Sequence, residues 1–299
     1  MRGMFAMIGA SFLFVMNDTL VKLAAQVWPV SQVMAVRGFI AIAIGFCAVV
    51  ATGNLGNAGV IKRPLVLART VSEVSVAVFF ISALSMMPLA DLTAILMVSP
   101  LFITALATIF LGEIVGWRRW SAILGGFGGM LLVIQPWAEA VRGPDYTFAA
   151  ILGICSVIGV ALRDFATRKL TSDVPSVLVM LATAIGSCIA GLLLTPFEPW
   201  RSFDIAAFSY LAIAAFLVTG GNFLMIVACR DVDLSVVAPY RYSAVIWAIL
   251  MGMFIFQEFP NKLALLGMTV IVTSGIYAIH RERVRRKQSA PDENSSLRK

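Results

Sequence analysis

The residues best suited to chemistry in this chain are the few charged and amide side chains that lie inside long apolar runs. They are Asn17, Asp18, Arg37, Glu73, Asp91, Arg163, Asp164, Asn222 and Arg241. An unpaired charge in apolar surroundings is costly, so these side chains are expected to pair with one another or to line a water-filled site. Carboxylate, amide and guanidinium groups in such places can recognise the charged ends of a small solute.

The sequence offers no motif for catalysis or for ATP hydrolysis. Its one histidine, His280, lies at the very end of the last apolar run, so a histidine-based triad or metal site has no candidate in the core of the apolar segments. No HExxH, GxSxG or phosphate-binding loop occurs. The cysteines form no CxxC pair and read as small buried hydrophobes: Cys47, Cys155, Cys188 and Cys229. We therefore expect neither an enzyme nor a bound cofactor or metal.

Two prolines and their neighbours provide further candidates. Pro100 and Pro239 lie inside apolar runs, where a proline removes a backbone hydrogen bond and bends a helix. The freed carbonyl could bind a substrate ammonium, or the bend could serve packing alone. The aromatic candidates could equally face lipid or pack against other helices. The predicted substrate-binding residues are Asn17, Phe79, Pro100, Asn222, Pro239, Tyr240, Arg241 and Trp247.

The elements that carry these residues must lie in lipid. Of the 299 residues, 60% are hydrophobic and 13% charged, whereas soluble chains average roughly 45–50% and 25%. The apolar runs are continuous over about 17–22 residues, which is the length of a membrane-crossing helix and unlike the alternating strands of a barrel. Ten such helices are predicted, at about 4–23, 33–52, 68–86, 91–111, 119–135, 147–165, 175–195, 204–228, 235–256 and 262–280.

An internal repeat divides these helices into two halves. At an offset of 146 residues, the segment 18–34 matches the segment 164–180, with an aspartate, a basic residue, a proline and a Val-Met pair in the same order. At an offset of 145, Glu113 matches Glu258. Each copy holds five helices, so the second copy enters the membrane from the other side. Such inverted repeats are common among secondary transporters.

The predicted fold is therefore all-α and integral to the membrane, with ten transmembrane helices in two inverted five-helix repeats around a central cavity. The repeats occupy residues 1–137 and 138–280, and residues 281–299 form a basic tail that we expect to be disordered. With both termini in the cytoplasm, 17 of the 23 basic residues lie on the cytoplasmic side, which satisfies the positive-inside rule. This accounts for the net charge of +7 without nucleic-acid binding.

The repeat makes Asp18 and Asp164 equivalent residues near opposite sides of the membrane, which suggests two gates. Asp18 would pair with Arg37 on the outer side. Asp164 would pair with Arg163 or Arg241 on the inner side, and alternating access would exchange one closed side for the other. The alternatives are ordinary i,i+4 pairs between each aspartate and the basic residue that follows it, and an Arg37 that reaches to the headgroups.

Four stretches carry a family resemblance: residues 17–22, residues 35–40, residues 83–113 and residues 235–258. In order, they resemble the end of helix 1, the helix 2 arginine motif, and the fourth helix of each unit in the EamA-type branch of the drug/metabolite transporter superfamily. That fourth helix carries a proline and ends in a Gly-Glu pair. The family's Trp-Gly in helix 1 is replaced here by Phe14-Val15, and the glycine before the second glutamate by Gln257.

The resemblance implies export of small metabolites across a bacterial-type inner membrane, and within the family the chain is most similar to exporters of amino acids, neutral and aromatic. The implied partners are a small-molecule substrate and the lipid bilayer, and a monomer is compatible with the sequence. The alternatives are a carrier of a nucleoside, a cofactor precursor or a cationic drug, and an integral-membrane enzyme or receptor. The sequence leaves open whether protons are coupled to transport.

Overall fold

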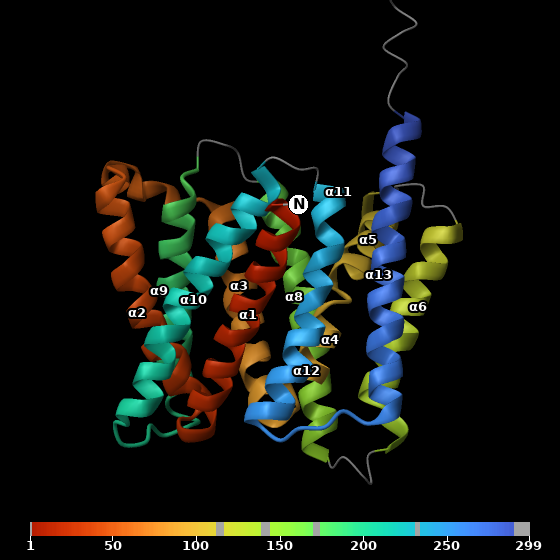
Figure 1. Cartoon of the computed structure of the whole chain (residues 1–299). Helices are drawn as coiled ribbons and strands as arrows, with labels where there is room; N and C mark the ends of the chain where they lie inside the picture. Colours follow the sequence, from red (N-terminus) through yellow and green to blue (C-terminus); the bar gives the residue numbers. More distant parts are fainter. Residues whose placement is uncertain (1, 112–116, 139–143, 170–173, 231–233, 290–299) are drawn as a thin grey trace, which may run out of the picture.

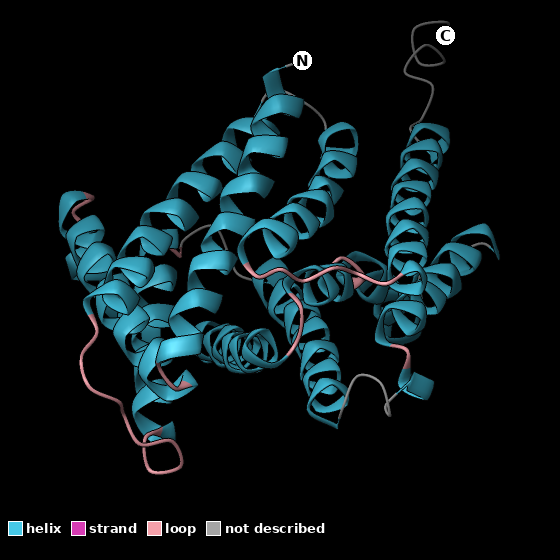
Figure 2. Cartoon of the chain, turned by 60° about the horizontal axis from the view of Figure 1, so that its bottom comes forward, coloured by secondary structure: helices cyan, strands magenta, loops and turns pink. Residues whose placement is uncertain are grey.

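The computed structural model describes residues 2–111, 117–138, 144–169, 174–230 and 234–289 (Figure 1). Every regular element in these ranges is helical (Figure 2). The long helices are α1 (Arg2–Val27), α2 (Val30–Ala51), α3 (Pro64–Met86), α6 (Trp117–Ile134), α8 (Pro144–Lys169), α9 (Ser176–Leu194), α10 (Ile205–Arg230) and α13 (Lys262–Ser289). The shorter ones are α4 (Leu89–Leu96), α5 (Ser99–Leu111), α11 (Leu234–Val237), α12 (Ser243–Ile255), η1 (Asn54–Lys62), η2 (Pro136–Ala138) and η3 (Ala238–Tyr242).

Ten segments of the described chain are long and apolar enough to cross a membrane. Seven lie in single long helices, and three are composite, formed by α4 with α5, by α6 with η2 and by η3 with α12. The predicted all-α fold with ten membrane-crossing helices is therefore confirmed. The N-terminal end of α1 and the C-terminal end of α13 lie on the same face of the bundle, at the top of Figure 1. We call this face the terminal face, and the other one the opposite face.

The pairing of helices follows the inverted repeat. Helix α1 runs from the terminal to the opposite face, whereas α8, the first helix of the second half, begins at the opposite face (Figure 1). Helix α1 packs along α10, and α3 packs along α8, so the first and third helices of each half exchange partners with the other half. Pro29 and Pro175, which the repeat equates, each precede the first turn of the next helix, with φ of −63° and −61°. Glu113 lies outside the described residues.

The fourth helix of each half is broken near its proline. A continuous helix with a bend was predicted over 91–111, but α4 ends at Leu96 and α5 begins at Ser99. Pro100 occupies the first turn of α5, where its missing N–H needs no partner. In the second half, Pro239 lies in η3, between α11 and α12. In both halves the regular α-helix is thus interrupted beside the proline, which could not continue it.

Glycines allow two pairs of helices to approach closely. A Cβ atom at Gly129 of α6 would lie 2.8 Å from the carbonyl oxygen of Gly267 in α13. A Cβ atom at Gly191 of α9 would lie 2.4 Å from the backbone nitrogen of Ala35 in α2. Small residues at helix contacts are the usual way in which membrane helices gain van der Waals packing, and the glycine-rich stretch of α6 serves this purpose.

One expectation is corrected at the C-terminal end. The segment after His280 was expected to be disordered from residue 281, but α13 continues as a helix to Ser289. This extension contains good helix formers such as glutamate, arginine and lysine, and the next proline comes only at Pro291. Residues 290–299 lie outside the described part of the chain.

The contact between α6 and α13 gives a testable prediction. Gly129→Ala would force the helices apart, which typically costs about 1–3 kcal/mol, so the melting temperature in detergent should fall. Gly128→Ala is the matched control, because nothing lies within 4 Å of a Cβ atom at that position. Equal melting temperatures for the two variants would show that the close approach contributes nothing.

Candidate functional site

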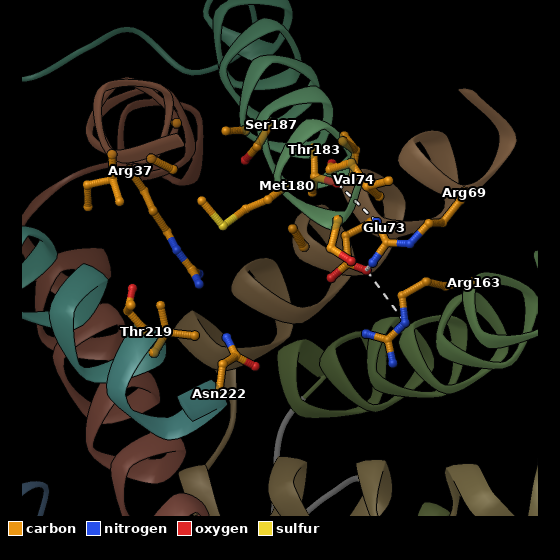
Figure 3. Close-up of a pocket in the computed structure, with 18 of the residues that line it drawn as sticks. Arg37, Arg69, Glu73, Val74, Arg163, Met180, Thr183, Ser187, Thr219 and Asn222 are labelled. Carbon is orange, nitrogen blue, oxygen red and sulfur yellow. Dashed lines mark hydrogen bonds and ion pairs between the residues drawn. The ribbon is translucent and has the colours of Figure 1, made fainter. Parts of the chain in front are cut away.

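A cavity of about 730 Å³ lies between α2, α3, α8, α9 and α10 (Figure 3). Ligand pockets usually measure about 300–1,000 Å³, so a small metabolite would fit. The cavity extends from the middle of the helices to Val174 and Ser176, at the start of α9 on the terminal face. Its polar lining is Arg37, Arg69, Glu73, Arg163, Thr167, Ser176, Thr183, Ser187, Thr219 and Asn222.

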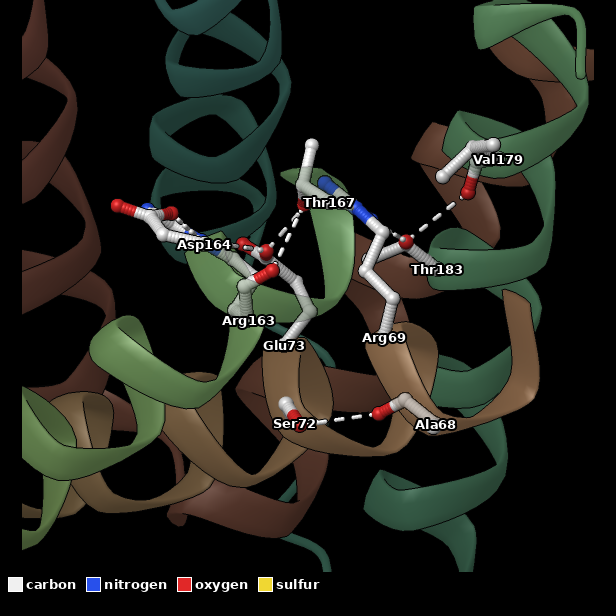
Figure 4. A network of polar contacts seen from close by, with 9 residues as sticks. All are labelled: Ala68, Arg69, Ser72, Glu73, Arg163, Asp164, Thr167, Val179 and Thr183. Atoms are coloured by element: carbon white, nitrogen blue, oxygen red, sulfur yellow. Dashed lines mark hydrogen bonds and ion pairs between the residues drawn. The ribbon is translucent and has the colours of Figure 1, made fainter. Parts of the chain in front are cut away.

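A polar network forms one wall of this cavity (Figure 4). Glu73 Oε2 lies 3.6 Å from Arg69 Nη2 and 3.5 Å from Arg163 Nε. Arg69 also donates hydrogen bonds to Thr167 Oγ1 at 3.2 Å and to Thr183 Oγ1 at 3.1 Å. These contacts join α3 to α8 and α9 near the terminal face, so they fix the relative positions of three walls of the cavity.

Arg163 is shared between two carboxylates. Besides Glu73, it contacts Asp164 Oδ1, through Nη2 at 2.7 Å and Nε at 2.9 Å. Arg241 makes no ion pair within the described part of the chain. Asp164 attracts its charge and Arg163 repels it. The predicted inner pairing of Asp164 thus involves its neighbour Arg163 in this conformation, and its role as a gate stays a prediction.

Arg37 stands apart from this network. Its side chain extends from α2 into the cavity, toward Asn222 and the wall that holds Glu73 (Figure 3). It makes no hydrogen bond or ion pair within the described ranges, and its electrostatic partners are Asp18 and Glu73. Asp18 instead accepts a hydrogen bond from Asn17 Nδ2 at 2.9 Å. The guanidinium of Arg37 is therefore available to a bound anion.

The sequence-predicted residues divide into two groups. Asn222, Arg37 and Arg163 line the cavity, and Asp164 lies beside it through its contact with Arg163. The others lie outside the cavity lining in this conformation: Asn17, Asp18, Phe79, Pro100, Pro239, Tyr240, Arg241 and Trp247. The indole of Trp247 packs edge-on against Phe12 with ring centroids 5.0 Å apart, as the packing alternative proposed. The binding and gating roles of all these residues stay predictions.

Several cavity residues were not predicted as site residues. Glu73 was identified from the sequence as a charge at membrane depth but was not assigned to the site. Its i,i+4 spacing from Arg69 on α3 is a signal that could have marked the two as a pair on one helix face. The hydroxyl side chains of Thr183, Ser187 and Thr219 gave no such signal. Serine and threonine are common in membrane helices, where the hydroxyl can donate a hydrogen bond to a carbonyl oxygen of the preceding turn. Thr183 and Thr219 do this, donating to the carbonyl oxygens four residues earlier.

The opposite face is closed by a partly buried ion pair. Lys22, near the end of α1, contacts Glu258 Oε1 in the loop after α12, and the side chains are 5% and 23% exposed. Lys22 Nζ also donates to the carbonyl oxygen of Met87 at 2.9 Å, and Glu258 Oε2 accepts from the N–H of Leu89 at 3.0 Å. One ion pair thus ties α1, the start of α4 and the end of α12 together.

The backbone at Gln257 positions this ion pair. Gln257 has a φ of 55°, in the left-handed region that glycine adopts most easily, which explains why the resemblance places a glycine at this point. The turn lets the N–H of Glu258 donate to the carbonyl oxygen of Gly252 at 2.9 Å. The carboxylate of Glu258 is then directed back toward Lys22.

Further hydrogen bonds across the opposite face connect the two halves. Ser31 N–H donates to Glu198 Oε2 at 3.0 Å, and the N–H of Arg201 donates to Gln32 Oε1 at 2.9 Å. Gln135 and Asn261 exchange amide hydrogen bonds of 2.9 and 3.1 Å. The structure is therefore closed at the opposite face, while its cavity reaches the terminal face.

Comparison with known proteins places the amino-acid sequence in a family. The sequence matches the EamA-like transporter family over residues 1–135 and 147–279. It is 29% identical over 206 residues to an S-adenosylmethionine uptake transporter of Rickettsia bellii, covering 67% of each chain. It is 30% identical over 189 residues to a riboflavin transporter of Vibrio cholerae, covering 60% of this chain and 59% of the relative. These two matches span about two thirds or less of the relatives' length.

Two further similarities cover most of the chain. A pseudopaline exporter of Pseudomonas aeruginosa is 24% identical over 285 residues, covering 92% of this chain and 94% of the exporter. A solved crystal structure superposes with a TM-score of 0.62 at 17% identity, covering 90% of this chain and 95% of that one. The structural likeness supports the fold alone.

The ion pair on the opposite face gives a second prediction. Lys22→Met leaves the Glu258 carboxylate without its cation, so we expect a loss of about 2–3 kcal/mol, below the range for fully buried pairs because Glu258 keeps contact with water. Thermal unfolding in detergent measures this loss, with Lys62→Met in the exposed η1 segment as the control. In the double variant Lys22→Met with Glu258→Gln, much of the loss should be recovered. Additive losses would mean that the two side chains are not coupled.

Proposed function

The chain belongs to the EamA-like transporter family, and from this premise we propose that it carries amino acids and metabolites that contain an amino-acid group. It is a multi-pass membrane protein of bacterial type that transports small metabolites, and not an enzyme. We propose that it works as a secondary carrier by alternating access, without ATP, since the sequence has no phosphate-binding loop.

The observation that carries this proposal is the unpaired guanidinium of Arg37 facing the Glu73 wall across the cavity. A guanidinium binds a carboxylate with two parallel hydrogen bonds, which fixes the orientation of the substrate as well as its position. A substrate ammonium would then lie toward Glu73 and the amide oxygen of Asn222. The apolar lining, which includes Val74, Ala77 and Met180, would contact the variable side chain.

The names of the relatives widen the range of substrates to test. S-adenosylmethionine contains the α-amino-acid group of methionine, so the same Arg37 and Glu73 contacts would serve it and free amino acids. Riboflavin lacks that group, and its transport would rely on the apolar and amide lining instead. Neutral and aromatic amino acids therefore stay our proposal for this chain, with S-adenosylmethionine as the second candidate, favoured by the similarity to the uptake transporter.

We further propose that the terminal face is cytoplasmic. With that orientation the basic residues satisfy the positive-inside rule, and the cavity is accessible to the cytoplasm, as export requires. The Lys22–Glu258 pair would then close the periplasmic side. In a transport cycle this pair would separate, while contacts across the terminal face, with Arg163 and Asp164 among them, would close over the substrate.

Proteoliposome counterflow tests the proposed function directly. Vesicles preloaded with unlabelled methionine or phenylalanine should accumulate the labelled amino acid transiently, without ATP or an ion gradient. S-adenosylmethionine and riboflavin, each at excess, serve as competitors that rank the substrate classes. The amino-acid proposal fails if neither amino acid accumulates above empty vesicles while one of the competitors does so when labelled.

Arg37 gives the sharpest single-residue prediction. Arg37→Gln keeps a hydrogen-bonding side chain but removes the charge, and charge-assisted hydrogen bonds contribute about 1.5–3 kcal/mol. The half-saturating substrate concentration in counterflow should therefore rise about 10- to 100-fold, with Arg37→Lys in between. Arg63→Gln, on the exposed loop before α3, should behave as the wild type. An unchanged half-saturating concentration in Arg37→Gln would remove Arg37 from the binding site.

A further inference from the structure

The walls of the cavity are built from the same helix faces in both repeats. At the repeat offset of 146 residues, Arg37 and Ala41 of α2 correspond to Thr183 and Ser187 of α9, and all four line the cavity. On the next pair of helices, Glu73 of α3 corresponds to Thr219 of α10, and both line it as well. These four helices therefore form a frame that is nearly symmetric between the two halves of the chain.

The fifth wall breaks this symmetry. Helix α8 contributes Arg163 and Thr167 to the cavity. Their equivalents at the same offset are Asn17 and Val21 of α1, which lie outside the cavity and are only 3% and 0% exposed. Helix α1 packs on α10 as α8 packs on α3, so the two helices occupy equivalent places in the repeat but differ in access to the cavity.

We propose that Asn17 and Val21 form the cavity wall in the state that opens to the opposite face, in place of Arg163 and Thr167. In an inverted repeat, the second state arises when the two halves exchange conformations, so α1 then takes the position that α8 has here. This inference rests on the proposed alternating access. It goes beyond it by assigning a second, state-specific set of substrate contacts.

The hydrogen bonding of Asn17 supports this assignment independently. Its amide nitrogen donates to Asp18, but its amide oxygen Oδ1 is buried without a hydrogen-bond partner in the described structure. A buried polar atom without a partner costs free energy and calls for an explanation. In the second state this oxygen would face the cavity, where water or a substrate ammonium can donate to it.

The exchange also changes the charge of the site. In each half, the residue before the aspartate donates a hydrogen bond to its carboxylate. Asn17 Nδ2 donates to Asp18 Oδ1 at 2.9 Å, and Arg163 Nε donates to Asp164 Oδ1 at 2.9 Å. Replacing Arg163 by Asn17 in the wall removes one positive charge from the cavity. A substrate carboxylate is therefore bound more weakly from the opposite face than from the terminal face, which favours release there.

Thiol labelling from each side tests the exchange. Val21→Cys and, as its matched control, Thr167→Cys are placed in a background without the native cysteines. Exposed Ser202→Cys marks the opposite face and Gly59→Cys the terminal face. A membrane-impermeant thiol reagent is applied to vesicles of both orientations, and counterflow is recorded for each variant. Val21→Cys should react from the side of Ser202→Cys, and Thr167→Cys from the side of Gly59→Cys.

The outcomes separate this inference from the proposed function. If Val21→Cys transports but reacts from neither side, or only from the side of Gly59→Cys, the exchange is wrong while the carrier function stands. If the wild type shows no counterflow of any tested solute, the proposed function fails instead.

If Val21→Cys proves to be inactive, a second variant still tests the exchange. Asn17→Ala removes one hydrogen bond, worth about a 3- to 10-fold change in affinity. It should raise the half-saturating concentration by that factor from the opposite face only, with Thr167→Ala acting only from the terminal face. An equal rise from both faces would overturn the exchange.

Discussion

The cost of placing charge in a bilayer is the constraint on which this structure depends. Most of the charged side chains at membrane depth form ion pairs, which lower this cost. Glu73 lies between Arg69 and Arg163, Arg163 also holds Asp164, and Lys22 holds Glu258. Arg37 and Arg241 make no side-chain hydrogen bond or ion pair in the described structure, and of these two only Arg37 lines the cavity. A charge kept in such a place is most simply explained by a ligand that neutralises it.

The distribution of these pairs also defines the conformation. Hydrogen bonds and the Lys22–Glu258 pair join the two halves at the opposite face, whereas the cavity extends to the start of α9 at the terminal face. The inverted repeat gives each wall of the cavity a counterpart in the other half of the chain. The close contact between Gly129 and Gly267 joins α6 and α13, which contribute no residue to the cavity lining.

The sequence predicted the fold better than the site. Long apolar runs and the 146-residue offset are sufficient for ten helices in two inverted halves, since both follow from membrane thickness and chain direction. Which residues point into the cavity is harder to predict, because a helix that is apolar on all its faces gives no indication of which face meets the cavity. Asn222 and Arg37 were found by being polar, but Thr219 and Ser187 were not, and Trp247 proved to pack against Phe12. The breaks beside Pro100 and Pro239 were foreseen as bends, but their exact form depends on neighbouring helices.

Above all, we propose that Arg37 binds the carboxylate of the substrate. Equilibrium binding to the purified protein tests it most directly, by comparing the best amino-acid substrate with its carboxamide in the wild type and in Arg37→Gln. We predict that the wild type prefers the amino acid by about tenfold or more, as expected for a charge-assisted hydrogen bond, and that Arg37→Gln binds both alike. The same preference in both proteins would contradict the account.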